Sequence, residues 1–249
     1  NKSKLGANAI LAVSMAVCKA GAICFGKELY QYIQRLSGSK KTMLPVPQVN
    51  ILDGGAHVGA ENDIQEYMIV PHGFKSFSES LRAGVETYHI IKNKIKKKYS
   101  YKAASVTSEG GFIAPMDGVG ERLQFLQSAV EESGYQKKIS LGLDSAASEF
   151  YDEKNGNYSI SNKKYSHGEL IDFYKNLVNK FPIMSIEDGF AQDDWEGWSS
   201  LNKQIGKKIQ LVGDDLLVTN IGRIKRALEH KACNALLLKV NQIGTVTEA

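Results

Sequence analysis

The chain has 249 residues, of which 43% are hydrophobic and 23% are charged. These fractions are ordinary for a soluble globular protein and exclude a disordered, collagen-like or disulfide-rich chain. The formal net charge of +4 is a mild excess that does not by itself indicate nucleic-acid binding. Cys18, Cys24 and Cys233 have no CxxC spacing, which favours reduced thiols in a cytosolic protein. We find no apolar stretch long enough to span a bilayer and no signal-peptide pattern.

The N-terminal region has a helical pattern. Residues 5–24 are apolar almost all round, which predicts a buried helix, and apolar residues at helical spacing continue to Leu36. The run Ser37-Gly38-Ser39-Lys40, followed by two prolines, marks a domain boundary, which we place between residues 43 and 44. Because the chain has no initiator Met and runs straight into an apolar pattern, we expect it to begin inside a longer protein.

Beyond Pro45 the pattern changes to short strand-like runs with amphipathic helices between most of them. Helix-capping residues are expected at Ser76, Asp117, Ser166 and Asn220. Strands that alternate with helices predict parallel pairing in an α/β layer or barrel. The expected strands are Val46–Leu52, Glu66–Val70, Ile139–Asp144, Ile183–Glu187, Ile209–Asp214 and Ala235–Val240.

Four of these strands end in a charged residue: Asp144, Glu187, Asp214 and Lys239. In a parallel barrel the carboxyl ends of the strands open into one bowl, so we expect these side chains to converge there. Three carboxylates without soft ligands suit Mg²⁺. Desolvation and the nearby cation would both lower the pKa of the lysine, which could then act as a general base.

The sequence resembles the enolase family along nearly its whole length. The resemblance lies in the opening segment 1–10 and in five motifs. They are Leu-Pro-Val-Pro at 44–47, Ser-Ile-Glu-Asp at 185–188, Asp-Asp-Trp-Glu at 193–196, Gly-Asp-Asp-Leu at 213–216 and Leu-Leu-Leu-Lys-Val-Asn-Gln-Ile-Gly-Thr at 236–245. The resemblance implies that residues 1–43 are the C-terminal part of an N-terminal α+β domain. It implies that residues 44–249 are the first six strands of a TIM-like (β/α)8 barrel.

The resemblance also implies an activity, the reversible dehydration of 2-phosphoglycerate to phosphoenolpyruvate in glycolysis. The enolase superfamily is known to use a lysine or histidine base together with Mg²⁺. By resemblance, Asp144, Glu187 and Asp214 would hold this Mg²⁺, and Lys239 would remove the C2 proton of the substrate. The family implies a cytoplasmic homodimer or larger homo-oligomer that has no nucleic-acid partner.

Three further residues match family positions. Glu109, in Ser-Glu-Gly-Gly, matches the glutamate that helps to expel the C3 hydroxyl as water, and Glu66 matches its carboxylate partner. A nearby second carboxylate can raise the pKa of such an acid. His57, in Gly-Gly-Ala-His, matches a histidine that contacts the substrate from a mobile loop.

The sequence departs from the family around Glu109. The loop usually reads Gly-Asp-Glu-Gly-Gly, whereas here Ser108 replaces the acid, and Ile113 is an extra residue before Ala114-Pro115. The family's second-metal loop would lie upstream of Asn1, and further substrate-binding groups would lie beyond Ala249. Since a closed barrel of this type needs eight strands, we expect the chain to be part of a longer protein.

Two alternatives to an enolase remain. The first is a non-catalytic enolase-like structural or binding protein, which the change at Ser108 would favour. The second is a related barrel enzyme that abstracts a proton from a different carboxylate substrate. The enolase-like settings of His57, Glu66 and Glu109 argue against the second, and the intact acids with Lys239 argue against the first.

Overall fold

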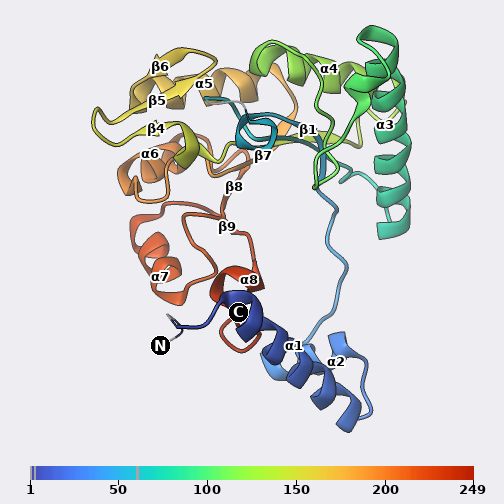
Figure 1. Ribbon diagram of the computed structural model, residues 1–249, viewed down its shortest axis with the longest axis vertical. Helices are drawn as coiled ribbons and strands as arrows, with labels where there is room; N and C mark the ends of the chain where they lie inside the picture. The colour runs from blue at the N-terminus through green and yellow to red at the C-terminus, as the bar shows by residue number, and fades with distance from the viewer. Residues whose placement is uncertain (1, 3, 60–61) are drawn as a thin grey trace.

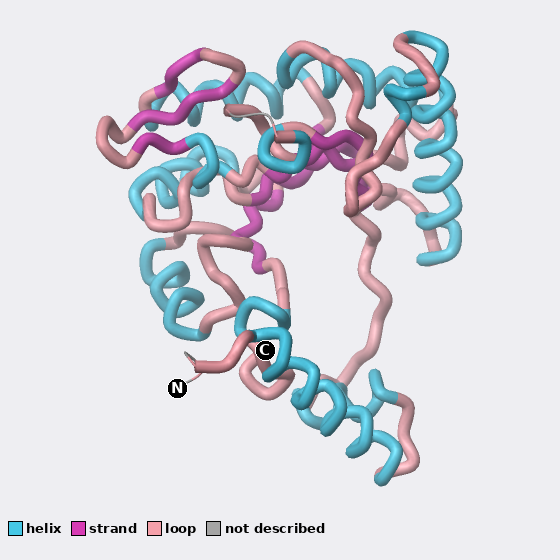
Figure 2. The backbone as a smooth tube through the Cα atoms, in the orientation of Figure 1, coloured by secondary structure: helices cyan, strands magenta, loops and turns pink. Residues whose placement is uncertain are grey.

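A computed structural model describes residues 2, 4–59 and 62–249 of the chain; Asn1 and Ser3 of the opening segment and Ala60 and Glu61 lie outside the described residues. A six-stranded sheet forms the centre of the larger, C-terminal part of the molecule (Figures 1 and 2). All six expected strands are present near their predicted positions, although the last is much shorter than predicted. In sheet order they are β1 (Val49–Asp53), β2 (Glu66–Val70), β3 (Ser140–Asp144), β7 (Ile183–Glu187), β8 (Gln210–Gly213) and β9 (Ala235–Leu236).

The pairing of the first strands differs from the prediction. Strands β3, β7, β8 and β9 pair in parallel, as expected, but β1 pairs antiparallel with β2, and β2 pairs antiparallel with β3. The segment between β1 and β2 contains only the short 3₁₀ turn Gly55–Val58 in its described part, not the helical crossover that a parallel pair needs. As a consequence β2 contributes its first residue, not its last, to the edge where the parallel strands end.

The sheet is curved but not closed. Among the described residues, β1 and β9 each pair with one strand, so both are edges of the sheet. Six strands fall short of the eight in a complete barrel of this type.

Helices cover the outer face of the sheet (Figure 1). Ser76, Ser166 and Asn220 cap helices as predicted, each accepting a hydrogen bond from a backbone N–H in the first turn. Asp117 does not: its side chain makes no capping hydrogen bond in the described structure, and its backbone N–H instead donates to Glu121 Oε2 at 2.8 Å. The helices after β2 are α3 (Phe77–Lys98), α4 (Gly118–Glu132), α5 (His167–Lys180), α6 (Trp195–Ile205), α7 (Ile221–His230) and α8 (Val240–Ile243).

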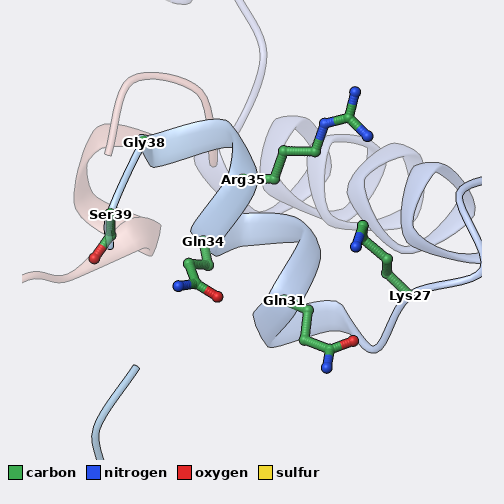
Figure 3. Close-up of a pocket in the computed structure, with 6 residues that line it drawn as sticks. All are labelled: Lys27, Gln31, Gln34, Arg35, Gly38 and Ser39. Carbon is green, nitrogen blue, oxygen red and sulfur yellow. The ribbon is translucent and has the colours of Figure 1, made fainter. Parts of the chain in front are cut away.

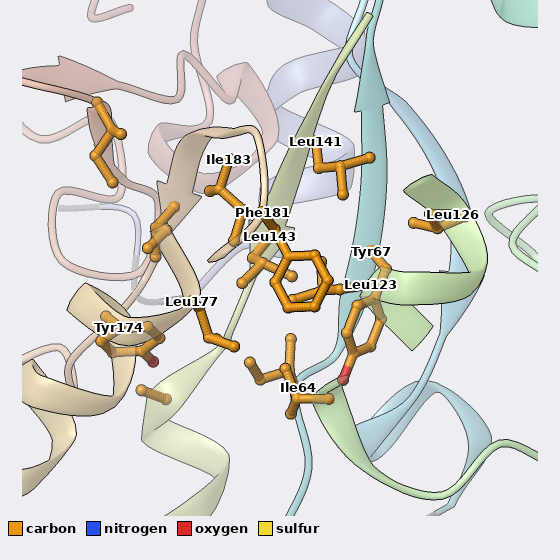
Figure 4. Packing of buried hydrophobic residues seen from close by; sticks show 14 of the residues in the cluster. Ile64, Tyr67, Leu123, Leu126, Leu141, Leu143, Tyr174, Leu177, Phe181 and Ile183 are labelled. Atoms are coloured by element: carbon orange, nitrogen blue, oxygen red, sulfur yellow. The ribbon is translucent and has the colours of Figure 1, made fainter. Parts of the chain in front are cut away.

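The hydrophobic core lies between the sheet and these helices. Figure 4 shows Leu141 and Leu143 of β3 and Tyr67 of β2 packed with Leu123 of α4 and with Phe181. Side chains alternate across a strand, so Gly142 and Asp144 lie on the opposite, inner face. A Cβ placed on Gly142 would lie 3.4 Å from Cβ of Met68, its partner in the register of β2 and β3, so Met68 lies on the same face as Gly142. Packing of the outer face therefore fixes which residues face the bowl.

A small antiparallel sheet, absent from the prediction, lies between β3 and α5. It consists of β4 (Tyr151–Asp152), β5 (Asn157–Ile160) and β6 (Lys163–Tyr165) in that order. Its turns are tight: Gly156 has φ of 66°, and Ser161 and Asn162 have φ of 48° and 63°. The Asn155-Gly156 pair is a hairpin signal that could have predicted it.

The N-terminal helices α1 (Ala7–Cys24) and α2 (Leu29–Ser37) lie at the end of the molecule remote from β1–β3, joined to β1 by an extended segment (Figure 1). The predicted burial of the first helix is wrong in this structure: only Cys18 and Ala22 of α1 are buried, because α1 packs chiefly on the short helices α2 and α8. By length and composition, contrary to our expectation, α1 is also apolar enough to cross a membrane. A single helix of this kind is weak evidence, so α1 is no clear membrane span.

Candidate active site

The inner rim of the sheet gathers the predicted acidic residues. Register pairs Glu66, the first residue of β2, with Asp144, the last residue of β3, and pairs Asp144 with Glu187 at the end of β7. Asp214 directly follows β8. Asp144, Glu187 and Asp214 are 8%, 8% and 6% exposed, so the rim holds at least three largely buried carboxyl groups.

Lys239 lies against this rim as predicted. It follows the short strand β9, and its Nζ forms an ion pair with Oδ2 of Asp214. Gln242 of α8 donates from Nε2 to the other oxygen, Oδ1, at 2.8 Å. The backbone N–H of Lys239 donates to Oγ1 of the buried Thr219 at 2.8 Å, which fixes the start of the lysine side chain. The lysine is 40% exposed and therefore accessible from the bowl.

Backbone N–H groups hold two further carboxyls at this edge, Asp144 and the neighbouring Asp188. Oδ1 of Asp144 accepts a hydrogen bond from the N–H of Ala146 at 3.0 Å. Asp188, which has φ of 43°, accepts from the N–H groups of Asp214 and Asp215 at 3.0 and 2.7 Å. Asp188 thereby joins the end of β7 to the end of β8 and sets the direction of Asp214.

Burial, together with the charges of neighbouring acids, raises the pKa values of Glu187, Asp144 and Asp188. Burial, followed by the charges of Asp188 and Asp214, raises the pKa of Glu187 to about 8. Burial and the neighbouring Glu187 raise the pKa of Asp144 well above its ordinary value. Burial also raises the pKa of Asp188 to about 7. Raised pKa values mean that ionising these neighbouring carboxyls together costs free energy. A divalent cation bound among them would offset that cost by stabilising the carboxylate forms.

The pKa of Lys239 is raised, which is opposite to the predicted direction. Burial lowers the pKa of this lysine, but the hydrogen bond and charge of Asp214, with the charges of Glu187 and Asp144, outweigh burial. The prediction assumed a cation among the carboxylates, whereas here the carboxylates alone act on the amine.

A second group of residues faces the first from β1, β2 and the loop that carries Glu109. His57 Nδ1 lies 3.5 Å from Asp53 Oδ1 and 3.7 Å from Glu66 Oε1, and His57 Nε2 lies 3.9 Å from Glu109 Oε1. Burial, then a hydrogen bond with Glu109, raises the pKa of Glu66 to about 8. The structure therefore brings His57, Glu66 and Glu109 together, in surroundings that favour the protonated form of Glu66.

The donor set suits a hard divalent cation. The three predicted ligands offer only carboxylate oxygens, which Mg²⁺ prefers. In the described part of the chain, however, the residues whose ligand atoms all lie within 4.8 Å of one another are not these three predicted ligands. They form two other sets, Asp53 with His57 and Glu66, and Asp188 with Asp214 and Asp215. Asp144, Glu187 and Asp214 are therefore not one such set in this structure, in which Asp214 accepts hydrogen bonds from Lys239 and Gln242.

Sequence reasoning did not assign roles to Asp53, Asp188 and Gln242. Asp188 lies inside the Ser-Ile-Glu-Asp motif, and Asp53 directly precedes the Gly54-Gly55 pair, so both were adjacent to recognised signals. Their importance depends on burial, 3% for Asp188 and 2% for Asp53, which one sequence does not reveal. Gln242 reaches Asp214 only because α8 turns back after β9.

Two surface pockets lie outside the rim. Figure 3 shows one on α2, lined by Lys27, Gln31, Gln34, Arg35, Gly38 and Ser39, with no acidic group among these residues. The other adjoins the small sheet β4–β6 and includes Asp193 and Asp194, of which Asp193 is held by Arg223 at 3.0 Å. Neither pocket is lined by the rim acids or by Lys239.

The fold and the rim together define an incomplete TIM-type α/β barrel whose candidate active site lies at the carboxyl ends of its parallel strands. Residues 41–249 match the family model described as "Enolase, C-terminal TIM barrel domain", and residues 1–33 match "Enolase, N-terminal domain". The chain belongs to the enolase family.

Curated relatives agree with this assignment. Proteins named "Enolase" from Methanopyrus kandleri and Thermococcus gammatolerans are each 53% identical to the chain, and one from Thermococcus kodakarensis is 51% identical. Each match covers 100% of this chain and 58% of the relative. The chain thus spans less than two thirds of the length of these relatives.

Proposed function

We propose that the protein containing this chain is a phosphopyruvate hydratase, which interconverts 2-phosphoglycerate and phosphoenolpyruvate in a Mg²⁺-dependent reaction of glycolysis. The observation that carries the proposal is the facing arrangement of Lys239 and Asp214 beside the buried acids Asp144 and Glu187. Membership of the enolase family supports the same activity. We propose a boundary between residues 43 and 44, a cytoplasmic location and a homodimer or larger homo-oligomer on family grounds alone.

In this proposal Asp144, Glu187 and Asp214 hold Mg²⁺. When bound, the cation would offset the carboxylate charge that now raises the pKa of Lys239, and it would stabilise the negative charge that develops on the substrate. Lys239 in its neutral form removes the C2 proton onto Nζ. The backbone hydrogen bond from Lys239 to Thr219 keeps the lysine directed into the bowl during that transfer.

The group on the opposite side serves the leaving hydroxyl. Glu66, with its pKa raised to about 8, holds a proton at neutral pH and shares a hydrogen bond with Glu109. Glu66 passes this proton to Glu109, whose side chain is 56% exposed and can reach into the bowl. Glu109 then gives the proton to the C3 hydroxyl, which leaves as water when the C3–O bond breaks. His57, within 4 Å of Glu109, is the proposed substrate contact on this side.

Ser108, the departure that would favour a non-catalytic protein, lies on the exposed surface of the loop. Because Ser108 is exposed, we infer that serine at this position leaves the contacts of Glu109 with Glu66 and His57 in place. We therefore retain a catalytic function.

Metal removal tests the proposal. In the full-length protein, formation of phosphoenolpyruvate from 2-phosphoglycerate should vanish in chelator and return when Mg²⁺ is added in excess. Asp214→Asn should raise the Mg²⁺ concentration needed for half-maximal activity, whereas Asp172→Asn, an exposed acid on α5, should not. Full activity in chelator would overturn the assignment of Asp144, Glu187 and Asp214.

A further inference from the structure

The loop that carries Glu109 rests on a buried carboxylate that the proposed reaction does not use. Asp53 ends β1, and its side chain is fully buried. One carboxylate oxygen, Oδ2, accepts a hydrogen bond from Oγ1 of Thr107. The other, Oδ1, accepts from Nδ2 of Asn50 at 2.7 Å and lies 3.5 Å from Nδ1 of His57. Asp53 therefore contacts both the loop and the histidine on the Glu109 side of the bowl.

Thr107 links Asp53 to Glu109. Its hydroxyl oxygen donates to Asp53 and accepts from the backbone N–H of Glu109 at 3.2 Å. Two hydrogen bonds thus link Glu109 to the buried side chain of Asp53. Thr107 stands where the family motif has its first glycine, and glycine has no hydroxyl to make this link.

The backbone of the loop is shaped to lie over the carboxylate. A Cβ placed on Gly111 would lie 2.5 Å from Cγ of Asp53, so only glycine fits at this close approach. Backbone hydrogen bonds hold the loop to β1: Asp53 N donates to Phe112 O at 3.1 Å, and Phe112 N donates to Ile51 O at 2.8 Å. These bonds fix the base of the loop, whereas the contact from Thr107 fixes its tip.

We propose that Asp53 is a positioning residue for Glu109 and acts through the hydroxyl of Thr107. The inference rests on the proposed function, because it assigns Glu109 to the loss of the C3 hydroxyl. Thr107 and Asp53 do not touch the reacting atoms in this account; they set where the Glu109 carboxyl can reach. Since deprotonation at C2 by Lys239 precedes the loss of the hydroxyl, weakening this link should slow dehydration but leave C2 exchange.

The test measures two rates for the same full-length protein with Mg²⁺ and 2-phosphoglycerate. One is the exchange of the C2 proton with deuterium from solvent, followed by proton NMR, and the other is the formation of phosphoenolpyruvate, followed by its absorbance. Thr107→Val should lower dehydration at least about tenfold, as expected for a misplaced catalytic group, and should leave exchange within about threefold of the parent. Thr107→Ser, which keeps the hydroxyl, should restore dehydration to within about threefold.

Three further variants complete the test. Asp53→Asn should show the same split between exchange and dehydration, and it decides the question if Thr107→Val does not fold. The loss in the double variant should be smaller than the product of the two single losses, because both act through one contact. Ser105→Ala is the matched control, since among the described residues its hydroxyl donates to Lys102 O alone, within its own turn, and both rates should stay at the parent value.

The outcomes separate this inference from the proposed function. Unchanged dehydration in Thr107→Val, equal losses of exchange and dehydration, or a failure of Thr107→Ser to restore dehydration would overturn the positioning role while the parent remains an enolase. A parent protein that neither exchanges nor dehydrates the substrate would overturn the proposed function and this inference with it.

Discussion

Replacing Glu187 by glutamine should stabilise the protein at high pH when divalent cations are removed. Burial and the charges of Asp188 and Asp214 raise the pKa of Glu187 from 4.5 to about 8. Because the folded pKa lies above the unfolded one, the protonated carboxyl contributes its full stability below about pH 4.5. That contribution is lost progressively as the pH rises through about 8. Glutamine has the same shape and no charge, so Glu187→Gln avoids the loss.

The size of the effect follows from the shift. A change from 4.5 to about 8, at about 1.4 kcal/mol per pKa unit, gives an upper limit of about 5 kcal/mol in the free energy of unfolding at pH 8.5. At pH 5 the same arithmetic leaves less than about 1 kcal/mol. The gain should therefore grow steadily across this range of pH.

The assay is urea unfolding of the full-length protein in chelator at pH 5, 7 and 8.5, with Glu229→Gln, an exposed residue of α7, as the control. Adding Mg²⁺ at pH 8.5 should stabilise the parent protein and have little effect on Glu187→Gln, which has lost a ligand. Equal stability of Glu187→Gln and Glu229→Gln at pH 8.5, or a loss of stability at every pH, would refute the reasoning from a crowded acidic rim.

Three other predictions concern the loop, the open sheet and the close glycine. Glu109→Gln should slow dehydration at least about a hundredfold while C2 exchange continues; loss of both together would remove Glu109 from the hydroxyl step. Residues 1–249 expressed alone should aggregate or melt without cooperativity and have no measurable activity, because β1 and β9 leave unpaired edges; a soluble, cooperatively melting and active product would contradict this. Gly111→Ala should lower the melting temperature and slow dehydration, since its Cβ would lie 2.5 Å from the Asp53 carboxyl; a fully active, equally stable variant would show that the loop can shift.

The sequence predicted much of the fold because periodicity and caps act locally. Six strands fell near their expected positions, and Ser166 caps its helix through a complete capping box. The antiparallel pairing of β2 was not predictable from alternation, since strand direction depends on whether a helix crosses between neighbouring strands. The exposure of α1 was not predicted, because an apolar sequence predicts a buried helix but does not show whether enough of the protein packs against that helix to bury it.

The residue types at the strand ends predicted the main residues of the site, but the sequence did not predict which side chains contact one another. Asp144, Glu187, Asp214 and Lys239 each follow an apolar run, which gives them a common edge in any parallel sheet. Asp53 and Asp188 act through burial and hydrogen bonds to backbone groups of other strands. Such contacts depend on the register of strands distant in sequence, so one sequence alone does not reveal them.

The central claim is that Lys239, set against the acidic rim, removes the C2 proton of 2-phosphoglycerate. The most direct measurement is exchange of that proton with solvent deuterium, by the full-length protein and by Lys239→Ala, in Mg²⁺. A fold control by circular dichroism would establish that the variant retains its structure. We predict rapid exchange by the parent and none above background by Lys239→Ala. Exchange by the folded alanine variant at the parent rate would assign the base to another residue and contradict the account.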